Sequence, residues 1–127
     1  LHNVANALAS LALCRAIGEL APKRPVHALV SILSDKAWPE LLVQLDRVVD
    51  RGVLPITPSA EGRRWDIEWL KRWLRDPDRP PARAAWQLIP DFAEALAEVQ
   101  RGAETVLVTG SFHTVGDVLE VLGMSPV

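Results

Sequence analysis

Short apolar runs alternate along this chain with segments in which apolar residues return at helical spacing, and this alternation limits the fold more than any other feature. Val26–Leu33 and Thr105–Thr109 are almost uninterrupted and rich in β-branched residues, which is typical of strands buried on both faces. Val53–Thr57 and Ala85–Ile89 are shorter strand candidates. Pro55 favours an edge strand or an irregular segment for Val53–Thr57, because proline cannot donate to a sheet ladder.

Helical periodicity fills the intervals between these runs. The predicted helices are Val4–Leu20, Leu41–Val49, Trp65–Leu74, Asp91–Arg101 and Val115–Leu122. We expect Asn3 to cap the first helix and Pro22 to end it. Gly52 is expected to close the second helix. For the fourth helix, Pro90 suits the first turn and Gly102 the end. Strands that alternate with helices of this length predict an α/β fold: a single three-layer domain with a mainly parallel sheet and helices on both faces.

Length and composition fit one globular domain. The chain has 127 residues, of which 49% are apolar and 24% charged, and its formal net charge is -2. This charge gives no reason to expect nucleic-acid binding, and no apolar run approaches the roughly 20 residues of a membrane span. The single cysteine, Cys14, lies among Ala and Leu and is interpreted as a buried, inert thiol that is compatible with a reducing compartment. We therefore expect a cytoplasmic domain without membrane or nucleic-acid partners, and the abrupt start suggests a fragment of a longer protein.

Ligands of parallel sheets bind outside the carboxyl ends of the strands. Four places in the sequence meet this description, the last of them only if a strand precedes it: Ser34-Asp35-Lys36, Pro58-Ser59, Gly110-Ser111 and Leu1-His2-Asn3.

The turn after the clearest strand is the strongest anion-site candidate. Gly110 allows a sharp turn, and the free amides of the following helix, with the Ser111 hydroxyl, favour a carboxylate or phosphate. From position alone, the simpler interpretation is that Ser111 only caps the helix. No P-loop spacing occurs anywhere in the chain.

The other polar candidates are also open to simpler interpretations. His2 opens a helix and could approach an anion, but a lone histidine there is usually solvated. Lys36 could steer an anion, although capping by Asp35 is the simpler role for that turn. His27 is expected to be a hydrogen-bonded core histidine, and because His2, His27 and His113 stand far apart we predict no metal site.

Trp65, Trp69 and Trp73 recur every four residues and therefore form one stripe of a helix. Basic residues lie nearby, a combination that can bind single-stranded nucleic acid. Acidic neighbours dilute that charge, and tryptophan at helical spacing is usually core. We predict that the stripe packs against the sheet.

Three segments resemble folylpolyglutamate synthase/dihydrofolate synthase enzymes, which are relatives of the Mur ligases. Thr105–Gly123 resembles their terminal strand, G-S-[FL]-[HY] turn and valine-rich helix. Leu1–Leu11 is similar to the D-x-A-H-N motif with its helix, and Val30–Leu42 is similar to the strand and D-K-D turn, here Asp35-Lys36-Ala37. The matches come in family order, and with the helices that they flank they cover roughly half of the chain. The resemblance implies the Rossmann-like C-terminal domain of this family.

What the resemblance implies about function goes further than the residues do. It implies an enzyme that uses ATP and Mg²⁺ to join L-glutamate to a folate through an acyl phosphate, with the P-loop and magnesium ligands on a central domain that this chain lacks. Ser111 and His2 would then contact the glutamate, and Asn3, Asp35, Lys36, Gly110 and His113 would line the rim. No catalytic residue, bound cofactor or independent activity is expected of this chain alone. The alternative is a non-enzymatic α/β module that binds nucleotide or protein, partly through exposed tryptophans.

Overall fold

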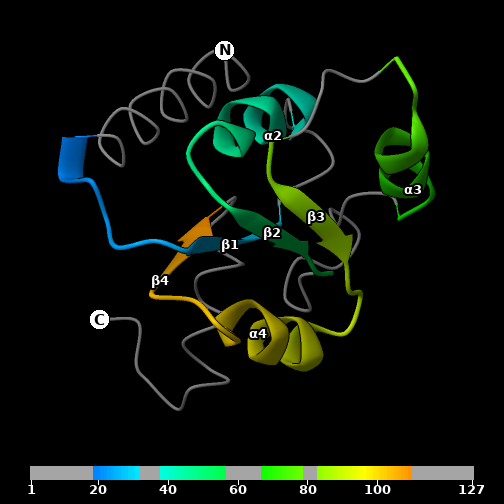
Figure 1. Cartoon of the computed structure of the whole chain (residues 1–127). Coiled ribbons are helices and arrows are strands. Elements are labelled where there is room, and N and C mark those ends of the chain that lie inside the picture. The colour runs from blue at the N-terminus through cyan, green and yellow to red at the C-terminus, as the bar shows by residue number, and fades with distance from the viewer. Residues whose placement is uncertain (1–18, 32–37, 57–66, 79–82, 110–127) are drawn as a thin grey trace, which may run out of the picture.

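The computed structural model describes residues 19–31, 38–56, 67–78 and 83–109, and of residues 38–41 the backbone alone. Seven regular elements lie in these ranges (Figure 1). They are β1 (Val26–Val30), α2 (Trp38–Asp46), β2 (Arg51–Leu54), α3 (Ile67–Arg75), β3 (Ala85–Leu88), α4 (Phe92–Gln100) and β4 (Thr105–Thr109).

The described strands form one parallel sheet in the order β3-β2-β1-β4. The predicted α/β class and parallel sheet are thereby confirmed. Of the two alternatives for Pro55, the edge strand is wrong, because β2 lies between β1 and β3, whereas the irregular segment is confirmed, because Pro55 lies outside the strand. β2 ends at Leu54, one residue before the proline, so the missing N–H of Pro55 removes no bond from the ladder.

Helices cover both faces of the sheet, as Figure 1 shows. On one face, Val26, Ala28 and Val30 of β1 belong to a core cluster with residues of α2 and with Leu70 of α3. On the other face, Leu29 belongs to a second cluster, formed largely with residues of α4. The alternation follows from the pleat of the strand, which sends successive side chains to opposite faces. All five residues of β1 are buried, so the predicted strand buried on both faces is confirmed.

Two predicted helix boundaries are wrong in detail. Gly52 does not close α2, which ends at Asp46; it lies inside β2 under the ring of Trp86. Pro90 does not lie in the first turn of α4, because Asp91 is the N-cap and its Oδ1 accepts a hydrogen bond from the Glu94 amide at 2.8 Å. The proline therefore precedes the cap.

Other boundaries agree with the prediction. Gly102 follows the C-cap Arg101 with a φ of 73°, a conformation that glycine adopts without strain. The first helix ends at Leu20, before Pro22, while most of Val4–Leu20, Asn3 and all of Val115–Leu122 lie outside the described residues. Within the described ranges, no helix has the length and apolar character needed to cross a bilayer.

Candidate functional site

The order of the four described strands creates a switch point between β1 and β4. From β1 the chain moves outward to β2 and β3, and then returns to the other side of β1 as β4. Connections that leave the carboxyl ends of two such neighbours run in opposite directions, which opens the crevice in which α/β proteins bind ligands. The carboxyl ends of β1 and β4 are therefore the candidate site.

Backbone pairing fixes these two strand ends relative to each other. Val30 and Thr109 are register partners, and the Ser31 amide donates to the Thr109 carbonyl oxygen at 3.3 Å. Ser31 is buried, with 2% of its surface exposed. The loops that follow β1 and β4 thus begin side by side.

The site residues that the sequence predicts lie outside the described residues. Gly110, Ser111 and His113 follow Thr109 in the chain, and Asp35 and Lys36 follow Ser31. His2 and Asn3 belong to the undescribed N-terminal segment, as does Cys14, and Pro58-Ser59 also falls in an undescribed range. The structure establishes where two of the predicted loops start, and the roles of the seven site residues stay predictions.

The carboxyl ends of β2 and β3 have their backbone groups engaged with each other. The Ile89 amide donates to the Leu54 carbonyl oxygen, and the Ile56 amide donates to the Pro90 carbonyl oxygen, both at 3.1 Å. These bonds hold the two strand ends together, as the bond between Ser31 and Thr109 does for β1 and β4.

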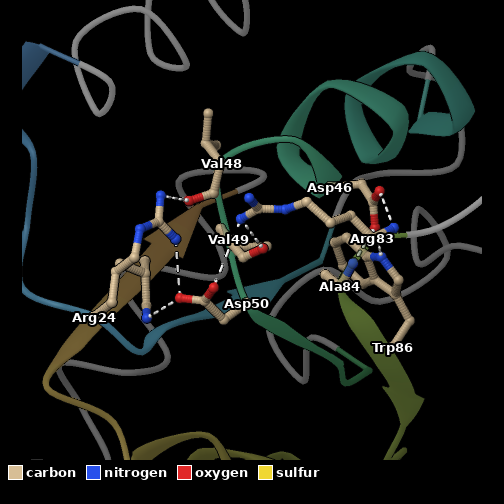
Figure 2. A network of polar contacts seen from close by, with 9 residues as sticks. Arg24, Asp46, Val48, Val49, Asp50, Arg83, Ala84 and Trp86 are labelled. Carbon is tan, nitrogen blue, oxygen red and sulfur yellow. Dashed lines mark hydrogen bonds and ion pairs between the residues drawn. The ribbon is translucent and has the colours of Figure 1, made fainter.

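A polar network that the sequence did not predict lies at the opposite, amino edge of the sheet (Figure 2). Asp50 precedes β2, and its Oδ2 accepts from the Val26 amide at 2.7 Å and from Arg24 Nη1 at 2.9 Å. The Val26 hydrogen bond, together with Arg24 and the nearby Arg83, holds the pKa of the Asp50 carboxyl below its usual value of 3.8, against the opposing effect of desolvation. Asp50 thereby links the starts of β1 and β2.

Asp46, the last residue of α2, extends this network to β3. Its Oδ2 accepts from the Arg83 amide at 2.7 Å, and its Oδ1 accepts from the Ala84 amide at 3.0 Å and from Trp86 Nε1 at 2.7 Å. Both carboxylates are thus committed to bonds that hold strand starts together. Their position at the amino edge gives them a structural role, away from the candidate site.

His27 is a satisfied core histidine, as the sequence predicts. It is 6% exposed, and its Nδ1 donates to the carbonyl oxygen of Val99 at 2.9 Å, near the end of α4. Among the residues that the structure describes, no group of three or more His, Cys, Asp or Glu side chains could hold a metal ion.

The tryptophan stripe is only partly core. Trp73 is half-buried against the first cluster, as predicted, and Trp65 lies outside the described residues. For Trp69 the prediction of packing is wrong, because this side chain is 56% exposed. The buried face of α3 runs through Leu70, Trp73 and Leu74, whose spacing of three and four residues makes a stripe too narrow to include Trp69.

Comparison with known proteins finds similarity among solved structures. No protein-family model matches the chain, and no match was found among curated proteins. FolC from E. coli in complex with ADP is 29% identical, with a TM-score of 0.71, over 92% of this chain and 26% of that protein. The bifunctional folylpolyglutamate synthase/dihydrofolate synthase of Yersinia pestis, complexed with AMPPNP and a Mn ion, is 25% identical, with a TM-score of 0.71, over 93% of this chain and 27% of that protein.

The folylpolyglutamate synthase of Mycobacterium tuberculosis, complexed with ADP and AMPPCP, shares the fold at a TM-score of 0.74 and 22% identity, over 95% of this chain and 28% of that protein. The chain thus spans about a quarter of the length of the proteins that it resembles. The sequence resemblance and the structural likeness agree: this chain closely resembles the C-terminal α/β domain of folylpolyglutamate synthase/dihydrofolate synthase enzymes.

Proposed function

We propose that this chain is the C-terminal domain of a cytoplasmic, ATP-dependent ligase that joins L-glutamate to a folate through an acyl phosphate. The domain contributes contacts to glutamate and nucleotide and does not catalyse the reaction alone. The observation that carries this proposal is the β1–β4 switch point, from which the predicted Gly110-Ser111 and Asp35-Lys36 loops lead. Similar E. coli and Yersinia pestis enzymes with bound ADP, or with AMPPNP and Mn, support it.

The proposed role of the site is to position glutamate. Ser111 lies two residues beyond Thr109, so its Cα is within about 7 Å of the strand end. The amides and hydroxyl of the helix start that the sequence predicts at this point would suit a carboxylate. Held there, glutamate gains by orientation, because its amine can be aimed at an acyl phosphate on the folate. His2 would assist at the phosphate or glutamate, and Asn3, Asp35, Lys36 and His113 would shape the rim.

ATP and Mg²⁺ belong, in this proposal, to a P-loop domain of the same polypeptide. The chain has no P-loop spacing of its own and spans about a quarter of the relatives' length. When the two domains are joined, the nucleotide supplies the phosphoryl group that activates the folate carboxylate. The present chain holds the second substrate against that group and excludes water from it.

The test is glutamate-dependent ADP release by the polypeptide that joins this chain to its P-loop domain. Ser111→Ala should raise the KM for glutamate by about tenfold with a smaller effect on kcat, the pattern of a lost ground-state contact. Ser125→Ala is the matched control and should leave both constants unchanged. Full activity of the Ser111→Ala variant at low glutamate would remove Ser111 from the site, and glutamate-dependent ADP release by the present chain alone would contradict its proposed dependence on the P-loop domain.

A second hypothesis, the non-enzymatic binding module, is favoured by one observation. Trp69 is 56% exposed on α3. If the module binds nucleotide through this surface, adding nucleotide should protect Trp69 from iodide quenching. The joined polypeptide should then show no glutamate-dependent ADP release, which separates the two functions.

A further inference from the structure

We draw no further inference here: the strongest candidate, the surface patch on α3 where Trp69 is 56% exposed beside the exposed Arg72, carries none because nothing in the structure shows what covers it.

Discussion

Gly52 and Trp86 are register partners in the β2–β3 pair, and the indole ring of Trp86 lies directly over Gly52. A Cβ at position 52 would overlap the six-membered ring, so only glycine admits the indole in this position. Gly52→Ala should therefore force the ring aside and lower the free energy of unfolding by about 1–3 kcal/mol, the usual range for overpacking. Urea denaturation followed by circular dichroism measures the change.

A double-mutant cycle separates this clash from other effects of the substitution. In a Trp86→Leu background the side chain opposite position 52 is smaller, so Gly52→Ala should cost clearly less than it does in the natural chain. An equal cost in both backgrounds would show that the ring is not the reason for glycine at this position.

Asp46 holds the start of β3 against the end of α2, so its substitution should lower the stability of the fold. Its two oxygens accept three hydrogen bonds, from the Arg83 and Ala84 amides and from Trp86 Nε1. Asp46→Asn replaces one oxygen with an NH₂ group that faces donors, and should destabilise the fold by about 2 kcal/mol. Asp78→Asn, at an exposed position, is the control and should stay within about 0.5 kcal/mol.

Acid should destabilise the fold through Asp50 and Glu98. The pKa of Asp50 lies below its usual value of 3.8, mainly because the Val26 amide donates to it, and a hydrogen bond from Arg51 lowers the pKa of Glu98 below its usual value of 4.5. The stabilisation from such groups is complete above the unfolded-state pKa and is lost as pH falls through the folded-state pKa.

The free energy of unfolding should therefore decline below about pH 4.5, as these carboxylates take up protons more readily in the unfolded state. Asp50→Asn should flatten that decline while lowering stability at neutral pH, and denaturation at a series of pH values checks it. An unchanged slope in the variant would count against Asp50 as a source of the acid sensitivity.

The fold was largely predictable because strands buried on both faces leave a strong apolar signal. β1 and β4 were recognised for that reason, and Thr105–Thr109 was predicted with its observed bounds. The misassigned features are those decided by tertiary contacts. Gly52 has the sequence signature of a helix end, and its real partner, Trp86, is more than thirty residues away along the chain. Pro55 suggested either an edge strand or an irregular segment, and the sequence alone could not choose between them: it lies just beyond the paired residues of an interior strand.

The sequence allowed the location of the candidate site to be predicted, but not the arrangement of its side chains. Apolar strands followed by small or polar residues mark the carboxyl edge, and the strand order then selects the β1–β4 end of it. The Asp46 and Asp50 network leaves no comparable signal, because each aspartate bonds to amides that lie more than twenty residues away in the sequence. Only the assembled sheet brings these groups together.

Trp69 and Trp73 should differ sharply in their effect on stability. Trp73 is half-buried against the core, so Trp73→Ala should cost about 2 kcal/mol, whereas Trp69→Ala should change the free energy of unfolding by about 0.5 kcal/mol or less. Iodide quenching gives an independent check, because Trp69→Phe should reduce the quenchable emission more than Trp73→Phe does. Equal losses of stability in the two alanine variants would show that Trp69 also contributes to the core.

His27 connects the centre of the sheet to the end of α4, and its tautomer can be predicted. The Val99 carbonyl is among the last four of the helix, which have no partner within the helix, and a carbonyl can only accept. The proton must therefore be on Nδ1, which nitrogen chemical shifts of the imidazole would report. His27→Leu leaves this buried carbonyl unpaired and should cost about 1–3 kcal/mol. His27→Asn places an amide donor close to the position of Nδ1. Its loss of stability should therefore be smaller than that of His27→Leu, even though leucine is the more apolar side chain. A larger loss for His27→Asn would mean that packing, and not the hydrogen bond, explains a histidine in this strand.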